Sequence, residues 1–192
     1  MESKKNTSST TVIDELANLK KITEVDNYIK RDFGDLVITA ADESHVKEIA
    51  ELWANLASIQ QVFAPERYSF RAEGKDWQQF VRNKLAKKNN LLLVMQKRGD
   101  YEVRGFLYLQ TITLPSSDLI VKGIIEDIYT KPQYRKQDVA SNMLDVALDW
   151  TISHNIKQVD LISLSNTKGL IDFYSNFLKR FKKDIKLELL TF

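Results

Sequence analysis

The segment YRKQDVASNML, residues 134–144, has the composition of a loop that can hold an anion. Arg135 and Lys136 supply positive charge, and the apolar residues that follow recur at helical spacing, so the loop opens directly into a helix. The first N–H groups of a helix lack intrahelical partners and lie at the positive end of its dipole, which favours a phosphate. The loop has no glycine, however, and Asp138 stands at the helix start. A solvated turn with Asp138 as the N-cap is therefore the alternative interpretation.

Other kinds of chemistry find little support in the composition. The 192 residues include no cysteine, which excludes disulfides, thiolate nucleophiles and cysteine-ligated zinc. His45 and His154 each stand alone, so we expect no metal site. The 28 basic and 26 acidic residues give a net charge of +2, which favours no nucleic-acid partner. No apolar run is long enough for a membrane span and the start resembles no signal peptide, so we expect a cytoplasmic protein without a membrane partner.

Two further groups of residues can either do chemistry or belong to the framework of the fold. Glu126 and Asp127 are adjacent carboxylates in an apolar segment typical of a strand. Adjacent strand residues point to opposite faces, so both can serve one site only if a β-bulge turns one of them. Phe173, Tyr174 and Phe177 form a stripe at helical spacing, for which periodicity alone favours a place in the core.

The elements before the loop are expected in two parts. Residues 1–34 predict an N-terminal extension, a disordered tail followed by an amphipathic helix that ends near Gly34 and packs on the domain or forms a homodimer contact. The domain proper, residues 35–192, begins with a strand at 35–41 and a helix capped by Asp42. An irregular aromatic stretch at 58–70 separates this helix from a second one at 77–85.

The remaining elements predict a mixed sheet. Short turns join three strands at 90–96, 102–114 and 118–130, which indicates an antiparallel meander. A helix at 138–153 and a strand at 158–164 should complete a parallel crossover unit, before a short helix at 166–177 and a last strand at 185–192. The expected fold is α/β (α+β mixed), with a mostly antiparallel sheet and helices on both faces.

The segment IEDIYTKPQYRKQDVASNML closely resembles the acetyl-CoA-binding segment of the GNAT superfamily of N-acetyltransferases. In that family a strand with an ED pair is followed by P-x-Y-R and by a loop of arginine or glutamine, two residues, glycine, one residue, and glycine or alanine. Arg135 and Ala140 match this loop, whereas Asp138 replaces its first glycine. The resemblance extends over residues 36–192: VRGFLYL is similar to the central hairpin strand and SNTKGLIDFYSNF to the C-terminal Asn and Phe-Tyr motif, although the usual Gly-Phe after Phe-Tyr is missing.

This resemblance implies the acyl-CoA N-acyltransferase fold and an N-acetyltransferase activity. A primary amine of a small molecule or peptide would attack the thioester of acetyl-CoA directly, without an acyl-enzyme and without a metal. Glu126 would remove a proton from the amine through water, Asp127 would attract a cationic substrate, and Tyr174 would protonate the leaving thiolate. Backbone groups of Ile128 and Thr130 would pair with the pantetheine arm, and the Ile128 N–H would polarise the thioester carbonyl.

The same resemblance implies the residues that hold the rest of the donor and the acceptor. Asn166 would cap its helix and contact the cofactor, and Phe63 and Tyr68 stand where the family builds its substrate wall. The cofactor's phosphates would lie against Arg135, Lys136, Gln137, Asp138, Val139, Ala140 and Ser141. The competing hypothesis is a catalytically impaired binding or interaction module on the same fold, because Asp138 adds negative charge beside the phosphates.

Overall fold

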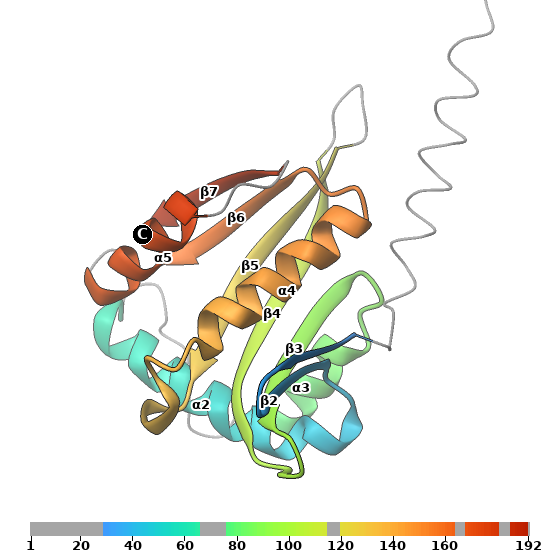
Figure 1. Cartoon of the computed structure of the whole chain (residues 1–192), viewed down its shortest axis with the longest axis vertical. Helices are drawn as coiled ribbons and strands as arrows, with labels where there is room; N and C mark the ends of the chain where they lie inside the picture. Colours follow the sequence, from blue (N-terminus) through green and yellow to red (C-terminus); the bar gives the residue numbers. More distant parts are fainter. Residues whose placement is uncertain (1–28, 66–75, 115–119, 164–167, 181–184, 192) are drawn as a thin grey trace, which may run out of the picture.

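The structure is a computed structural model that describes residues 29–65, 76–114, 120–163, 168–180 and 185–191. Within these residues one sheet has its strands in sequence order (Figure 1). The strands are β1 (Lys30–Phe33), β2 (Leu36–Ala40), β3 (Asn90–Lys97), β4 (Val103–Leu114), β5 (Ile120–Thr130), β6 (Gln158–Ser163) and β7 (Lys186–Thr191). Neighbours from β1 to β5 are antiparallel, while β5–β6 and β6–β7 are parallel, which confirms the mixed, mostly antiparallel sheet.

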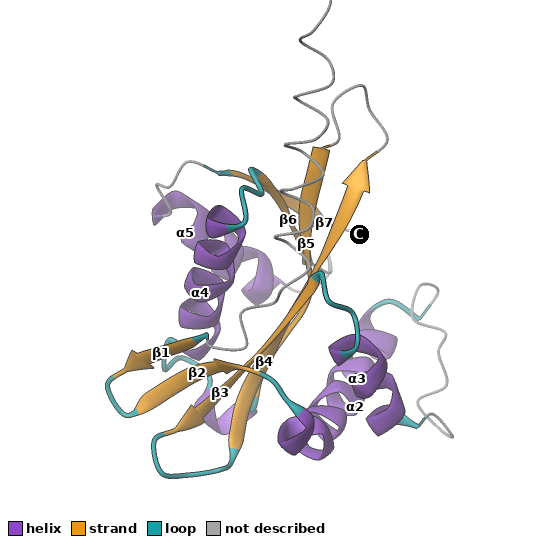
Figure 2. Cartoon of the chain, turned by 90° about the vertical axis from the view of Figure 1, so that its right-hand side faces the viewer, coloured by secondary structure: helices purple, strands orange, loops and turns teal. Residues whose placement is uncertain are grey.

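Helices cover both faces of this sheet, as predicted. Figure 2 shows α4 (Val139–Ser153) and α5 (Lys168–Arg180) on one side, and α2 (Val46–Phe63) and α3 (Trp77–Leu85) on the other. Each side has its own apolar cluster: Leu107, Ile125 and Leu144 belong to the α4 side, and Trp53 and Phe106 to the α2 side. No helix of the described ranges has the length and apolarity to cross a membrane.

The start of the sheet differs from the prediction. Residues 30–33, expected at the end of a helix that stops near Gly34, instead form β1, which pairs antiparallel with β2. Gly34 makes the tight turn between them with φ of 62°, a conformation that glycine adopts without strain. The sheet edge offers backbone partners that override the weak helical pattern at this end. The tail and helix expected within residues 1–28 lie outside the described residues.

Helix α2 is longer than the sequence indicated. Asp42 caps the preceding 3-10 turn η1 (Glu43–His45) by accepting from the Ser44 N–H at 2.9 Å, as expected of a capping residue. The helix then continues to Phe63, through residues 58–63 that were expected to be irregular. Nothing interrupts the helix before Pro65, which disfavours helical geometry at Ala64 and so ends it. Phe63 therefore lies on a helix and not in a loop.

Strand β5 departs from regular geometry at the two carboxylates. Tyr108 of β4 pairs with Asp127 and Leu109 pairs with Ile125, so Glu126 is the extra residue of a bulge. On its other edge β5 pairs with β6 only from Gly123 to Ile125. After Ile125, β5 pairs with β4 and no longer with β6 within the residues that the structure describes.

Candidate active site

The bulge directs both carboxylates to the α2 and α3 side of the sheet. Glu126 Oε2 lies 3.2 Å from Lys84 Nζ of α3, and its Oε1 accepts a hydrogen bond from the Gln110 amide of β4. Asp127 contacts α2, as described next. The condition stated from the sequence, a bulge that lets both residues serve one site, is thus met by the structure.

Asp127 is held by two donors from one face of α2. The Trp53 indole N–H donates to Oδ2 at 3.0 Å, and the Gln60 amide donates to Oδ1 at 3.1 Å. Burial raises the pKa of Asp127 above its usual value, and the nearby Glu126 charge adds to this, while the two hydrogen bonds act in the opposite direction. Asp127 is thus a fixed and incompletely compensated acid that anchors α2 to β5.

Tyr174 of α5 approaches the same place from the other side of the sheet. Its side chain is buried among the apolar residues of the α4 side, as its stripe pattern predicted. Its pKa is raised, mainly by burial and further by the charge of Asp127. Asp127 and Tyr174, which pack on opposite faces of the sheet, are thus within electrostatic range of each other. Two hydroxyls at the ends of β5 and β6, of Thr130 and Ser163, are buried without a hydrogen-bond partner in the described part of the chain.

The loop between β5 and α4 keeps the backbone shape of a phosphate-binding turn. Lys136 and Asp138 have φ of 61° and 56°, so Asp138 has the left-handed conformation that glycine usually provides. The alternative in which the Asp138 carboxylate caps the helix is wrong, because its side chain makes no capping hydrogen bond to the backbone. Its Oδ1 instead lies 3.4 Å from the Ser141 hydroxyl. The carboxylate thus leaves the first N–H groups of α4 unoccupied.

The side chains of this loop divide into exposed and buried ones. Arg135, Lys136 and Gln137 are exposed with Asp138, whereas Val139 and Ser141 are buried, so the latter two can offer a ligand only their backbone. Ala140 is half-buried. The Arg135 side chain donates from Nε to the Thr130 carbonyl at 3.2 Å, which ties the loop back to the end of β5.

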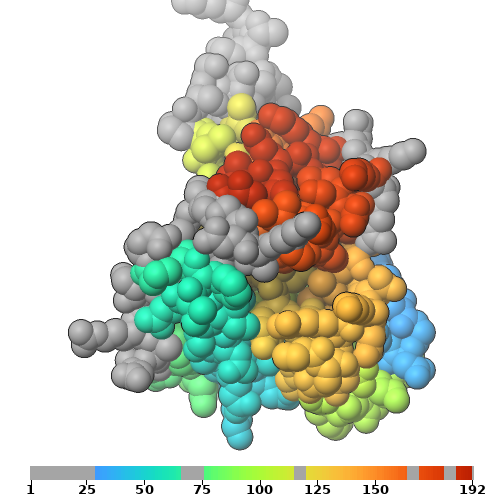
Figure 3. All heavy atoms as spheres, turned by 90° about the vertical axis from the view of Figure 1, so that its left-hand side faces the viewer, coloured from blue at the N-terminus to red at the C-terminus, as the bar shows by residue number. Residues whose placement is uncertain are grey.

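The acceptor side is described only in part. Phe63, at the end of α2, is 43% exposed, with Val62 beside it at 77%. On the face shown in Figure 3, the end of α2, the segment from β5 into α4, and the C-terminal segment with α5 adjoin one another. Tyr68 and Asn166, predicted to contact substrate and cofactor, lie outside the described residues.

Sequence reasoning missed the residues that hold the carboxylates. Trp53 was expected only as part of a core face, and Gln60 follows it by seven positions, the helical spacing that could have marked a polar partner on that face. Gln110 and Lys84 left no local signal, because they meet Glu126 from 16 and 42 positions away.

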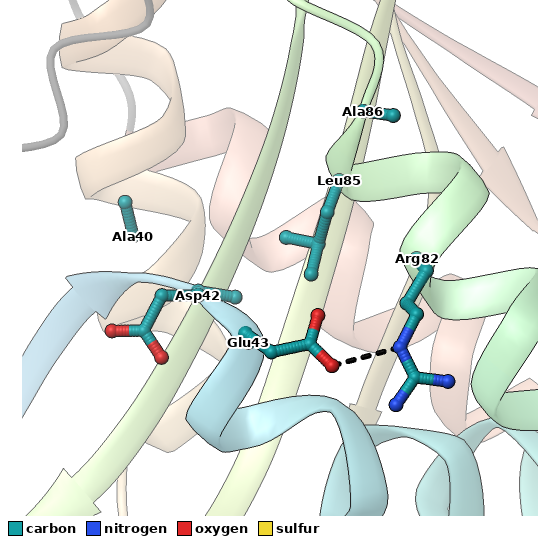
Figure 4. A pocket seen from close by; sticks show the side chains of 7 residues that line it. Ala40, Asp42, Glu43, Arg82, Leu85 and Ala86 are labelled. Carbon is teal, nitrogen blue, oxygen red and sulfur yellow. Dashed lines mark hydrogen bonds and ion pairs between the residues drawn. The ribbon is translucent and has the colours of Figure 1, made fainter.

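A separate pocket of about 570 Å³ lies between the start of η1 and the end of α3 (Figure 4). Its lining includes the ion pair of Glu43 and Arg82, 2.7 Å apart, and both side chains are well exposed. Ala40, Asp42, Leu85 and Ala86 also line it, and none of the predicted site residues does. The pocket therefore lies apart from the carboxylate site.

Comparison with known proteins identifies a family match that covers the candidate site. The model of the family described as "Acetyltransferase (GNAT) family" matches residues 53–177, which include β4, β5, the loop, α4 and most of α5. This range holds Glu126, Asp127, residues 135–141 and Tyr174. No match was found among curated proteins.

Solved structures share the fold at low sequence identity. A ribosomal-protein-alanine N-acetyltransferase from Brucella melitensis biovar Abortus 2308 has 17% identity and a TM-score of 0.58 over 74% of this chain and 90% of its own. A protein from Clostridium acetobutylicum, described as a predicted acetyltransferase and solved with acetyl-CoA, has 17% identity and a TM-score of 0.55 over 77% and 90%. An aminoglycoside acetyltransferase from an uncultured soil metagenomic sample, solved with trehalose, has 11% identity and a TM-score of 0.58 over 79% and 92%. These likenesses show the fold.

Proposed function

Because the chain belongs to the acetyltransferase (GNAT) family, we propose that it transfers the acetyl group of acetyl-CoA directly to a primary amine of a small molecule or peptide. The observation that carries the proposal is the parting of β5 from β6 at the bulge. It leaves one edge of β5 without a β6 partner in the stretch that carries both carboxylates, and Asp127 of this stretch is within electrostatic range of the buried Tyr174. A thioester donor that enters the opening would meet these groups together.

The residues present fit such a donor. The segment from Glu126 to Thr130 has no β6 partner, so an extended pantetheine arm can pair with it as an added strand. Ile128 is the better placed of the two predicted backbone partners, because the Thr130 carbonyl already accepts from Arg135. Residues 135–141 supply two exposed cations and a helix start without a side-chain cap, which suits a pyrophosphate, and Asn166 is proposed to contact the cofactor as well.

The chemistry requires an amine without its extra proton. An alkylamine has a reference pKa near 10.4, so at neutral pH a base must accept a proton before the nitrogen can attack. Glu126 is that base in our proposal, directly or through one water, and the Gln110 amide holds its Oε1 in place. Acetyl-CoA supplies an acyl group activated as a thioester. The Ile128 N–H stabilises negative charge that develops on its carbonyl oxygen.

Tyr174 is the proposed acid for the leaving sulfur. Its raised pKa keeps the phenol protonated throughout the neutral range, so the donor is in the required state. The same burial disfavours a free phenolate, so the proton is released only as negative charge develops on the sulfur. Asp127, Phe63 and Tyr68 are proposed to contact the acceptor. The names of the Brucella and metagenomic proteins support a peptide amine and a small-molecule amine respectively.

The first test is a calorimetric titration of the purified chain with acetyl-CoA. We expect saturable binding, and no heat at millimolar ligand would overturn the proposal. Binding without turnover on a panel of peptide and small-molecule amines would instead support the impaired binding module.

Two substitutions test the assigned roles. Glu126→Gln and Tyr174→Phe should each lower kcat by about 10²-fold or more, the usual contribution of a general base or acid. Glu51→Gln and Tyr101→Phe change exposed residues of the same types and should keep the parental rate. Steady-state kinetics with saturating acetyl-CoA measures the effect, and an unchanged rate removes that residue from the mechanism.

A further inference from the structure

The proposed base already holds an ammonium group. Lys84 Nζ lies 3.2 Å from Glu126 Oε2, 4.2 Å from the centre of the Tyr108 ring and 5.4 Å from the centre of the Phe80 ring. The Lys84 side chain is only 17% exposed. A carboxylate with aromatic faces around it is the chemistry by which proteins bind alkylammonium ions.

Each oxygen of Glu126 already has a donor. The Gln110 amide donates to Oε1, and Lys84 Nζ donates to Oε2. An acceptor ammonium that reached the base would compete with Lys84 as the cationic partner of this carboxylate. The charge of Lys84 also acts on Asp127, whose pKa it lowers against the effect of burial. Both carboxylates of the site are thus partly neutralised by the chain's own lysine.

We propose that Lys84 occupies the subsite of the acceptor's ammonium, and that the acceptor binds by displacing it. This rests on the proposed function and specifies its substrate: a primary amine on an unbranched aliphatic stem, like the side chain it replaces. Lys84 reaches this subsite from the last turn of α3 on a flexible four-carbon stem. Its ammonium can therefore leave without movement of the helix. Its partner Glu126 is 28% exposed, so water can reach the carboxylate when Lys84 leaves.

The alternative is that Lys84 is a permanent positioning residue that orients Glu126. The two roles predict opposite effects. If Lys84 competes with the acceptor, its removal strengthens amine binding, because the amine no longer has to displace Lys84 from Glu126. If Lys84 only orients the carboxylate, its removal leaves amine affinity unchanged or weaker.

The test uses butylamine, which is the lysine side chain as a free molecule. Calorimetric titration at neutral pH compares the parent with Lys84→Met, which keeps a long apolar stem and removes the charge. We expect Lys84→Met to bind butylamine about fivefold more tightly than the parent. Lys87→Met, at an exposed lysine three positions later and beyond the end of α3, should match the parent, and uncharged butan-1-ol should show no gain. Equal or weaker butylamine affinity in Lys84→Met, or the same gain in Lys87→Met, overturns the proposal.

Two further variants assign the gain to the carboxylate. Lys84→Arg keeps the positive charge and should show no gain, and adding Glu126→Gln to Lys84→Met should abolish the gain. A gain that survives Glu126→Gln overturns the assignment to this subsite. Thermal unfolding of each variant shows that it is folded. Butylamine is titrated without acetyl-CoA, so absence of acetyl-CoA binding would count against the proposed function, while absence of the gain counts against the subsite alone.

Discussion

At residue 138 the backbone and the side chain have opposite consequences for a bound phosphate. The left-handed backbone, with φ of 56°, keeps the turn in the shape that leads into α4. Aspartate reaches this conformation more readily than most residues, which explains how the turn forms without its glycine. The carboxylate, however, stays exposed beside the helix start and adds negative charge where a pyrophosphate would lie. The shape is therefore preserved while the electrostatics are weakened.

Asp138→Gly should tighten acetyl-CoA binding, because it removes a charge that repels the phosphates and keeps a left-handed turn accessible. An effect of about fivefold corresponds to one exposed charge near a surface ligand, and it should shrink at high salt. Asp138→Asn is the matched control for charge alone, since asparagine also tolerates this conformation. Calorimetry in low and high salt measures both, and an unchanged or weaker affinity in both variants would show that the carboxylate is not the obstacle.

A site residue could be predicted from the sequence when it belongs to a short contiguous motif. Glu126, Asp127 and Tyr174 were recognised because they stand within short contiguous patterns. Lys84 had no such pattern, since its meaning comes from a contact across 42 positions. Whether the recognised residues act as assigned stays a prediction that the substitutions above test.

Among the elements, β4 must approach its neighbours unusually closely next to the site. A side-chain carbon built on Gly105 would lie 2.6 Å from the Tyr129 carbonyl oxygen of β5, 3.2 Å from Met143 Cε and 3.3 Å from Val139 Cγ1 of α4. The first of these contacts is with backbone and cannot be relieved by a change of rotamer. Glycine at this position therefore allows β5 and the start of α4 to pack together against β4.

Gly105→Ala should lower the free energy of unfolding by about 1–3 kcal/mol, the usual cost of overpacking. It should also weaken acetyl-CoA binding, because the displaced atoms belong to the strand and helix that join at the loop. Gly169→Ala on α5 is the control: no atom of the described residues lies within 4 Å of its added carbon, and alanine favours a helix, so stability should rise by up to about 1 kcal/mol. Urea unfolding measures both, and equal stability of Gly105→Ala and the parent would contradict the packing argument.

Most elements could be located from hydrophobic periodicity, and the errors have physical reasons. The meander and the parallel unit follow from turn lengths and apolar runs, which are local properties. Residues 30–33 form a strand because the edge of β2 pairs with them, a tertiary effect that the sequence pattern does not contain. Residues 58–63 stay helical because no breaker precedes Pro65. The bulge at Glu126 could be stated only as a condition, since register depends on both strands.

For the whole molecule, the sheet separates two apolar clusters that each contain a buried tyrosine near the site. Tyr108 belongs to the α2 side and Tyr174 to the α4 side. Burial raises the pKa of each phenol, and the carboxylates between them add to the effect: Glu126 and Asp127 for Tyr108, and Asp127 for Tyr174. Composition and periodicity predicted one α/β domain with a substantial core. They did not predict that the charge of Asp127 would act on a tyrosine of each cluster, because that depends on the packing of the two faces around β5.

This arrangement predicts how the stability of the folded chain depends on alkaline pH. In the unfolded chain tyrosine loses its proton near pH 10, whereas in the folded chain Tyr174 keeps it to a higher pH. Above about pH 10 the unfolded state therefore binds fewer protons than the folded state, so the free energy of unfolding falls as pH rises. Between pH 9 and pH 11 one such group lowers the free energy of unfolding by about 1.4 kcal/mol in total. Tyr174→Phe should make the decline shallower by that amount, while Tyr101→Phe, at a residue 89% exposed, should keep the parental slope. Urea unfolding between about pH 9 and pH 11 measures the difference, and equal slopes in Tyr174→Phe and the parent would mean that Tyr174 ionises in the folded chain near the ordinary tyrosine value, so that burial does not hold its proton to higher pH.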